Sequence, residues 1–498
     1  MMLDIKNEEQ CKQKLFINAF FVLIFLLLCR MIAMCFIPIY DSSEARYAEI
    51  ARQMLVTGDW VTLQLDHGLP FWAKPPLSTW LSAFTMKCFG VNAFAVRLPG
   101  LLLSIGVLWL VWQFAKKHSG SVVATVTIVV LAGTLFFFLD AGTVMTDPSL
   151  VFCTTLSMVS FWHALVDKQK AWSYVFFISL GLGLLAKGPV ATVLVGLPIF
   201  FWVLLRNEWV NLWQRLPWIK GSLITAVIAL PWYALAEMRT PGFFSYFIVG
   251  EHFNRFLHSG WAGDKYGRAH DEPWGMIWIY ALLGMYPWNF LGGFWLVKYW
   301  KKVPALFRDS DGWMSYLFVF AVVPLCFFTF ASNIIYTYVF PSVPACALFF
   351  TQAWGRSKQP LKSVRLIFLW SLIVGVVFLL ITIGLKIKPE LVSKTHKYIV
   401  AAWMQQHPAH GSPLLYWATA LDYSAQFYSE GRAIMTMDEN VLCKAFSTHL
   451  KNYLVAEPQH MEQISTAIRS RCKPIYKGTY MDKTRMLYQC LPCIPRAV

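Results

Sequence analysis

Apolar runs separated by short polar segments make up most of the first 386 residues. Runs of roughly 18 residues or more are long enough to cross a bilayer as a helix. Eleven candidate spans lie near residues 15–38, 98–115, 121–139, 148–166, 172–186, 189–205, 221–237, 275–297, 313–331, 335–353 and 365–386. The pattern predicts an α-helical polytopic membrane protein with about 11–13 transmembrane helices.

The first run is expected to remain in the protein. A secretory signal peptide has a shorter apolar core followed by a small-residue cleavage site. This run instead carries Arg30 and leads directly into Asp41. Long basic side chains bury their stem and keep the charge in water, so Arg30 is expected to reach a lipid headgroup.

Composition and the placement of charge favour a membrane protein over a nucleic-acid-binding one. Hydrophobic residues form 57% of the 498 positions and charged residues 14%, against about 25% charged in soluble domains. The formal net charge is +16, but Lys and Arg lie in short clusters between apolar runs, such as 116–117 and 206–220. Such clusters face the cytoplasm, which places the N terminus inside and the tail outside. No nucleic-acid partner is expected.

The same alternation places five polar segments on the outer face. They are residues 39–97, the turn from Asp140 to Asp147, the turn at Lys187, residues 238–274, and the turn before Tyr338. The loops 39–97 and 238–274 are long, and long loops often carry function.

Residues 43–57 in the first outer loop are predicted to form an amphipathic helix. Apolar residues recur there at helical spacing, and Gly58 stands where the helix should end. Such a helix can lie in the membrane interface, with Glu49 and Arg52 on its solvated face.

Residues 387–498 are predicted to form a small soluble α/β domain outside the membrane, after a transmembrane domain over residues 1–386. Strand-like runs lie at 413–417, 432–435, 453–455 and 485–488, and helical stretches at 396–410, 440–450 and 460–471. Cys443, Cys472, Cys490 and Cys493 could form disulfides in an oxidising compartment. Cys490-Leu-Pro-Cys493 could equally be a redox or metal pair.

Ionisable groups near hydrocarbon are costly and are therefore candidates for function. Lys74 precedes Pro75 and Pro76, whose stiff backbone would hold the ammonium beside the membrane, where it suits a phosphate. Asp147 precedes Pro148. That pair is also consistent with an ordinary helix start.

Several motifs taken together resemble a known family over roughly the first 350 residues. They occupy residues 44–50, 58–60, 74–76, 146–148, 183–188, 251–256 and 336–338. The set resembles the ArnT-like lipid A aminoarabinose transferases of bacteria. It is also similar to the wider protein-mannosyltransferase-like group of polyprenyl-phosphate-dependent membrane glycosyltransferases. The resemblance implies a GT-C fold, a lipid-phosphate sugar donor and an active site at the outer membrane border.

The resemblance also implies roles for individual residues. Lys74, Arg255 and Tyr338 would line the donor phosphate. The catalytic candidates, which would face sugar and acceptor, are Asp41, Glu44 and Asp147. Supporting roles fall to Arg46, Tyr47, Lys187 and His252, of which His252 would be either polar support or a metal ligand. No cofactor is firmly implied, and a divalent metal is an open alternative.

Three positions depart from the aminoarabinose-transferase pattern. Ser43 stands where an aspartate is expected, which leaves the principal acid open between Asp41 and Glu44. Ala73 replaces a glutamate and weakens the case for a metal. Asn333 and Ile334 stand where a lysine is expected. These departures leave the identity of the sugar open.

The expected reaction is displacement at the anomeric carbon of the sugar, with polyprenyl phosphate as leaving group. The acceptor would be lipid A or lipopolysaccharide on the outer face of a bacterial inner membrane, and 4-amino-4-deoxy-L-arabinose is one candidate sugar. Transfer to protein Ser/Thr is an alternative. A lipid-linked-sugar flippase or transporter is another, although transporters place charges near the bilayer midplane. Sugar, acceptor, metal requirement and oligomeric state stay open.

Overall fold

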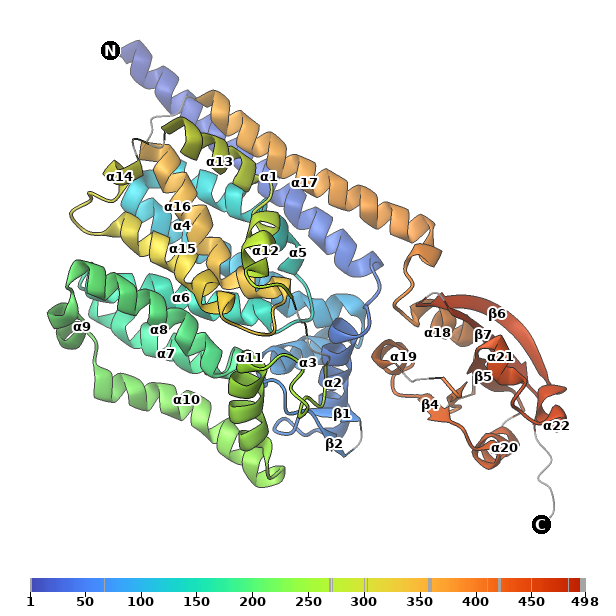
Figure 1. The fold of residues 1–498 in the computed structure, drawn as a ribbon. Coiled ribbons are helices and arrows are strands. Elements are labelled where there is room, and N and C mark those ends of the chain that lie inside the picture. The colour runs from blue at the N-terminus through green and yellow to red at the C-terminus, as the bar shows by residue number, and fades with distance from the viewer. Residues whose placement is uncertain are drawn as a thin grey trace.

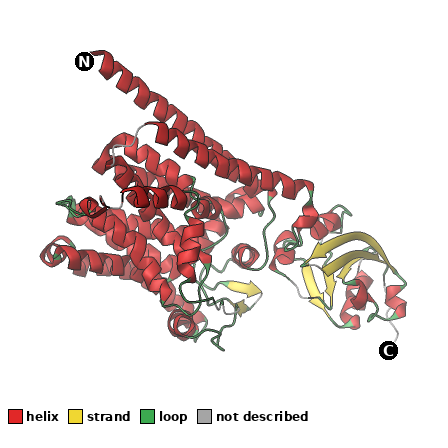
Figure 2. Cartoon of the chain, turned by 45° about the horizontal axis from the view of Figure 1, so that its top comes forward, coloured by secondary structure: helices red, strands yellow, loops and turns green. Residues whose placement is uncertain are grey.

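The protein consists of a large helical part and a smaller part that contains a β-sheet. The computed structural model describes residues 2–492 except 67, 268, 269, 271, 300, 302, 357–360, 410, 420, 421, 449 and 482. The long first helix and α17 run side by side along one flank of the helical part, and the sheet lies beyond their far ends (Figure 1). A short two-stranded hairpin lies beside the helices and is separate from the five-stranded sheet (Figure 2).

The helical part contains elements of very different length. They are α1 (Met2–Phe36), α2 (Ser43–Thr57), β1 (Gln64–Asp66), β2 (Leu69–Pro70), α3 (Leu77–Phe89), α4 (Ala93–Ala132), α5 (Leu135–Asp140), α6 (Asp147–Leu165), α7 (Lys170–Lys187), α8 (Pro189–Arg206), α9 (Trp209–Arg215), α10 (Trp218–Arg239), a π-helix (Ser245–Asn254), α11 (Arg255–Leu257), α12 (Met276–Gly284), α13 (Trp288–Tyr299), α14 (Val303–Leu306), α15 (Trp313–Thr329), a 3-10 helix (Tyr336–Ser342), α16 (Val343–Arg356) and α17 (Leu361–Ile387).

The helical part confirms a multi-pass membrane protein. Among the described residues, six helices are long and apolar enough to cross a membrane: Glu9–Phe36, Ala93–Ala132, Asp147–Leu165, Pro189–Arg206, Trp218–Arg239 and Val364–Ile387. Helix α4 covers two predicted spans, because its helical backbone is interrupted at Gly120. Gly100 lies against Thr143, whereas Lys117 pairs with Asp167. The two halves of α4 therefore run in opposite directions.

Two predicted spans differ from the continuous helices that were expected. The run 275–297 is divided between α12, which ends at Gly284, and α13, which begins at Trp288, directly after Pro287. The run 335–353 begins as a 3-10 helix that contains Pro341 and continues as α16. Proline has no backbone N–H and clashes with the preceding turn, so apolar composition alone predicted these elements wrongly.

Helix α2 begins and ends where the sequence predicts, but its polar face was predicted wrongly. Gly58 ends it in the left-handed conformation (φ 70°). Glu49 and Arg52, which were expected to be solvated, are buried and form a bidentate ion pair with distances of 2.6 and 2.7 Å. The helix has protein on both faces because α3 and the C-terminal part pack against it.

Arg30 is more enclosed by protein than expected. The residue is 7% exposed, and its Nε donates a hydrogen bond to the carbonyl of Ala141. The rings of Phe138 and Phe378 lie 5.9 and 5.2 Å from its Cζ. Arg30 is therefore enclosed between helices.

The C-terminal part is a small α/β unit, as the sequence predicts. Its strands β3 (Leu414–Trp417), β4 (Ala433–Thr436), β5 (Asn452–Ala456), β6 (Cys472–Tyr480) and β7 (Lys483–Cys490) form one sheet in the order β4-β3-β5-β7-β6. Pairing is parallel among β4, β3 and β5 and antiparallel among β5, β7 and β6. The helices are α18 (Lys397–Met404), α19 (Tyr423–Tyr428), α20 (Glu439–Thr448), α21 (Pro458–Met461) and α22 (Thr466–Arg469).

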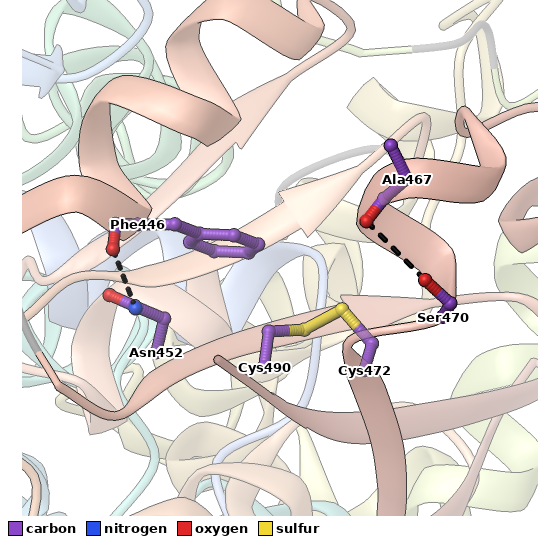
Figure 3. The surroundings of a disulfide bond; sticks show 6 residues. All are labelled: Phe446, Asn452, Ala467, Ser470, Cys472 and Cys490. Carbon is purple, nitrogen blue, oxygen red and sulfur yellow. Dashed lines mark hydrogen bonds between the residues drawn. A yellow bond between two sulfur atoms is a disulfide. The ribbon is translucent and has the colours of Figure 1, made fainter. Parts of the chain in front are cut away.

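A disulfide joins the edge strand β6 of this sheet to its antiparallel neighbour β7. Cys472 of β6 and Cys490 of β7 lie opposite each other in the register and are bonded (Figure 3). The alternative that Cys490 pairs with Cys493 in redox or metal chemistry was wrong for Cys490, and Cys493 lies outside the described residues. Cys443 is free. The proximity of the partners is set by the pairing of β6 with β7, and β6 was absent from the strands expected from the sequence.

The sheet domain contacts the first outer loop through polar groups. Asp41 is 8% exposed, and its carboxylate accepts hydrogen bonds from the backbone N–H of Ser424 (2.9 Å) and from the Ser424 hydroxyl. The backbone N–H of Ile39 donates to the hydroxyl of Tyr428 (2.7 Å). Burial raises the pKa of Asp41 to about 7, although both bonds from Ser424 favour the ionised form.

Asp41→Asn should stabilise the protein more at pH 8 than at pH 5. A carboxyl whose pKa is raised on folding destabilises the folded protein once the pH exceeds its folded pKa, because the charged group must then be buried. Asparagine keeps the shape of the side chain and stays neutral. The free energy of unfolding at pH 8 should therefore exceed that of wild type by at most on the order of 4 kcal/mol. Thermal unfolding of purified wild-type and variant protein at both pH values measures it.

Asp59→Asn is the matched control, since Asp59 lies in the same loop as Asp41 and pairs with the half-exposed Arg239 at the end of α10. The charge of Asp422 in the sheet domain also raises the pKa of Asp41, so its influence is part of the expected pH dependence. Equal effects of Asp41→Asn at pH 5 and pH 8 would contradict the assigned pKa of Asp41.

Candidate active site

A cavity of about 510 Å³ opens where the outer-loop segments meet the ends of the membrane helices. Its walls come from the starts of α2, α6 and α8, the end of α7, the segment before α3, and the π-helix with α11. In Figure 1, α2, α3 and α11 lie at the end of the helical part farthest from the N terminus. The structure brings together eight of the expected site residues in this lining: Arg46, Tyr47, Lys74, Asp147, Lys187, His252, Arg255 and Tyr338.

A buried carboxylate joins the two cations expected at a phosphate. One carboxylate oxygen of Glu251 accepts a hydrogen bond from Lys74 Nζ at 3.0 Å. Both of its oxygens accept from Arg255 Nη1, each at 3.2 Å. Its side chain is 3% exposed, whereas those of Lys74 and Arg255 are each 21% exposed. Both cations therefore reach the cavity, and the more deeply buried carboxylate of Glu251, which also lines it, holds them together.

Glu251 itself was not assigned a role from the sequence. Burial opposes its ionisation, but Lys74 and Arg255 outweigh burial and hold the pKa of Glu251 below its usual value. The sequence contained a clue, because Glu251 and Arg255 stand four residues apart and can pair on one helix face. Lys74 is distant in sequence, so its contact with Glu251 required the fold.

Hydrogen bonds hold the ammonium of Lys74, including the one to Glu251. Its ammonium also donates to the carbonyl of Ala73 at 2.7 Å. Pro76 directly precedes α3, which begins at Leu77. Ala73 lines the cavity, so the position where the related pattern has a glutamate offers only a methyl group and a backbone carbonyl.

Asp147 and Lys187 form a second ion pair on the cavity wall. Lys187 Nζ lies 2.6 Å from Asp147 Oδ1, and its ammonium stands 5.6 Å from the centre of the Tyr338 ring. Asp147 is the first residue of α6, with Pro148 in the first turn, so the helix-start interpretation also holds. An acid at a helix N terminus is stabilised by the helix dipole.

A glycine allows the end of α7 to approach the π-helix. Gly188 has φ 79°, and a Cβ there would lie 2.6 Å from the ring of Phe247 and 3.0 Å from that of His252. The close approach brings His252 Nε2 to 3.3 Å from the carbonyl of Lys187, while Nδ1 lies 2.8 Å from the carbonyl of Phe247. Burial lowers the pKa of His252.

The surroundings of His252 support a structural role more than a metal site. Both ring nitrogens face backbone carbonyls, and a neutral imidazole can donate only one of these bonds. Within the part of the chain that the structure describes, no group of three or more His, Cys, Asp or Glu side chains could hold a metal ion.

Arg46 and Tyr47 form the side of the cavity next to α2. Arg46 donates to the carbonyl of Tyr266 and lies 5.9 Å from the centre of the Phe71 ring. Tyr47 packs edge-on against the same ring at 6.0 Å. Their place in the lining agrees with a supporting role.

Asp41 and Glu44 do not line the cavity. Asp41 is bonded to Ser424 of the sheet domain, as described above. Glu44 forms a two-point ion pair with Arg97, with both N–O distances at 2.8 Å. Burial opposes ionisation of Glu44, but Arg97 outweighs it and lowers its pKa. Both acids are thus engaged in holding the first loop.

Asn333 also lies in the lining and ties two loops together. Its side-chain amide donates to the carbonyls of Arg255 (2.6 Å) and His258 (3.1 Å), and its oxygen accepts from the backbone N–H of His270 (3.1 Å). The residue that departs from the expected lysine thus fixes the backbone at Arg255. It adds no charge to the cavity.

Known proteins match the first part of the chain in sequence. A family model described as dolichyl-phosphate-mannose-protein mannosyltransferase matches residues 15–247. The undecaprenyl phosphate-alpha-4-amino-4-deoxy-L-arabinose arabinosyl transferase 1 of Pseudomonas fluorescens (strain Pf0-1) is 28% identical over 327 residues, 62% of this chain and 52% of the relative. The corresponding transferase of Edwardsiella ictaluri (strain 93-146) is 28% identical over 308 residues, 60% and 52% of the two chains. The chain spans about half the length of the curated relatives it matches.

The fold of the chain matches solved structures of ArnT over nearly its whole length. The crystal structure of ArnT from Cupriavidus metallidurans bound to undecaprenyl phosphate aligns with a TM-score of 0.75 and 17% identity, covering 97% of this chain and 99% of that one. The apo crystal structure of the same protein aligns with a TM-score of 0.72, also at 17% identity, over 96% and 99% of the two chains. At this identity the likeness shows the fold. The chain is thus similar in sequence to these arabinosyl transferases over its first part, and its fold is that of ArnT over nearly its whole length.

Proposed function

We propose that this protein transfers a sugar from a polyprenyl-phosphate donor to an acceptor at the outer membrane border. The observation that carries the proposal is the pair of cations, Lys74 and Arg255, that line the cavity on one buried carboxylate. A phosphate monoester or diester offers oxygens that accept from both cations at once. The names of the relatives, and the bound lipid in the matching ArnT structure, support the same donor class.

The proposed step is a displacement at the anomeric carbon of the sugar. The bond from that carbon to the phosphate oxygen breaks, the bond to the acceptor oxygen forms, and polyprenyl phosphate leaves with the electron pair. Negative charge grows on the leaving phosphate, where Lys74 and Arg255 stabilise it. Such preorganised electrostatic stabilisation is usually the largest catalytic contribution. The Tyr338 hydroxyl completes this side of the site.

Within the proposal, Asp147 is the acid that faces sugar and acceptor. It lines the cavity, whereas Asp41 and Glu44 hold the first loop. A hydroxyl acceptor would lose its proton to the Asp147 carboxylate as the bond to the sugar forms, and Lys187 would hold that carboxylate ionised and in place before the transfer. A phosphate acceptor arrives already anionic, so Asp147 would orient it through Lys187 or hold a cationic sugar.

The acceptor we favour is lipid A or lipopolysaccharide, and the sugar is 4-amino-4-deoxy-L-arabinose, which the names of the curated relatives give. Transfer of mannose to protein Ser/Thr is the second candidate, because the matching family model carries that description over residues 15–247. Ala73 and Asn333 in the cavity wall stand where the aminoarabinose-transferase pattern has charged residues, so the wall around the sugar differs in charge from that pattern.

The orientation we propose places the cavity and the sheet domain outside the cytoplasm of a bacterial inner membrane. The basic clusters between spans support this orientation. The disulfide between Cys472 and Cys490 supports it independently, since disulfides persist in oxidising compartments such as the periplasm.

Lys74→Ala should reduce sugar transfer at least about 100-fold, because loss of one preorganised group that stabilises developing charge costs on the order of 10²–10³ in rate. Mass spectrometry of lipid A and of secreted glycoproteins, from cells with wild-type or variant protein, measures transfer and identifies the acceptor. Lys87→Ala, an exposed lysine on α3, is the control and should transfer normally. Near-normal transfer by Lys74→Ala would show that Lys74 does not stabilise the leaving phosphate.

Asp147→Asn should lower turnover about 100-fold or more, whereas Asp41→Asn should retain turnover within a few-fold of wild type. The difference arises because only Asp147 faces the cavity. Initial rates with purified protein, donor and acceptor in detergent measure both variants at equal amounts of folded protein. A larger loss in Asp41→Asn than in Asp147→Asn would show that the acid has been assigned wrongly.

A single cysteine in the sheet domain tests the orientation. Leu450 is 85% exposed, so Leu450→Cys, in a background without other free cysteines, should react with a membrane-impermeant maleimide in intact spheroplasts. Gln214→Cys on α9, within the basic 206–220 cluster, should react only after the membrane is opened. The reverse pattern of labelling would refute the proposed orientation.

A further inference from the structure

A second cavity of about 350 Å³ lies among α1, α4 and α5, separate from the candidate active site. Its lining is apolar, with side chains such as Leu27, Leu101 and Trp109, except for Arg30 and Ser104. Helices α1 and α4 are both long and apolar enough to cross the membrane. The cavity is therefore an apolar groove between membrane helices that contains one cation.

Arg30 is held in the groove by few polar partners. The residue is 93% buried, and its Nε donates to the carbonyl of Ala141. Among the described residues, no acceptor bonds to its two Nη groups. The Phe138 and Phe378 rings nearby offer only their faces. Four guanidinium N–H donors are thus available to a ligand in the groove.

The acidic groups around Arg30 are already engaged. Asp140 and Glu44 are near enough for their charge to act on the guanidinium. Glu44, however, forms its two-point ion pair with Arg97, and the Asp140 carboxylate accepts from Thr143. No described acid forms a direct ion pair with Arg30. An ionisable group at membrane depth without a direct partner is costly and marks a functional site.

We propose that this groove binds an anionic glycerophospholipid, with one acyl chain along the apolar wall and the phosphate on Arg30. A planar guanidinium matches two phosphate oxygens, and a phosphodiester supplies the single negative charge that the groove lacks. Phe36 ends α1, so Arg30 lies roughly 9 Å of helix rise inside that end. A headgroup phosphate at the outer interface is within reach of its side chain.

The groove is distinct from the proposed donor site. None of the groove residues lines the larger cavity, and Lys74 and Arg255 line only the latter. The bound phospholipid would be a resident lipid that is not consumed by transfer. It would neutralise Arg30 and fill the space between α1 and α4.

Native mass spectrometry of the full-length protein in detergent tests the proposal, with dioleoylphosphatidylglycerol and dioleoylphosphatidylcholine as probes. Wild-type protein should bind one phosphatidylglycerol saturably and at least tenfold more tightly than phosphatidylcholine. Arg30→Leu should lose that preference. Lys386→Leu is the matched control: Lys386 is another cation at the same membrane border, 3.9 Å from the Phe36 ring, and its loss should leave the preference intact.

A second variant keeps the test decisive if Arg30→Leu does not fold. Ser104→Leu leaves Arg30 in place but narrows the groove, because Ser104 is buried in its wall. It should weaken phosphatidylglycerol binding at least tenfold while the protein elutes and unfolds as wild type does. Equal binding of the two lipids by wild type, or an unchanged preference in folded Arg30→Leu or Ser104→Leu, would overturn the proposal.

Discussion

A charge beside hydrocarbon is costly without a partner of opposite sign, and this constraint organises the end of the helical part that carries the cavity. Breaking a buried ion pair leaves an uncompensated charge at a cost of about 3–5 kcal/mol, so the pairs fix the segments that carry them. Glu44 with Arg97 holds the start of α2 against α4. Glu251 with Lys74 holds the segment before α3 against the π-helix. The cavity keeps its shape because both contacts join elements that are distant in sequence.

The sequence predicts the fold well where one periodicity dominates. Helix α2 has the predicted ends because apolar spacing and Gly58 both indicate them. The runs 275–297 and 335–353 were mistaken for continuous helices, since hydropathy does not register how Pro287 and Pro341 change the backbone. Strand β6 was missed because most of its side chains are exposed, Ile475 among them, so apolar and polar positions do not alternate along it.

The candidate site was predictable as a set of motifs but not as a network. Lys74, Asp147 and Arg255 stand in short motifs that resemble a family, so their gathering in one cavity could be expected. Asp41 lies in an equally acidic stretch, yet it faces Ser424, almost 400 positions away. No local pattern separates an acid that faces a cavity from one that faces another domain. Glu251 escaped assignment for the same reason.

The carboxylate of Glu251 has a further consequence for a site that handles charged lipids. A cavity lined by two unmatched cations would retain an anionic product tightly and would be costly to leave empty in a medium of low dielectric constant. Glu251 supplies an internal counter-ion, so Lys74 and Arg255 exchange one anion for another whenever a phosphate enters or leaves. Under the proposed chemistry, affinity for the lipid phosphate is a difference between two similar interactions, which favours turnover over tight retention of the product.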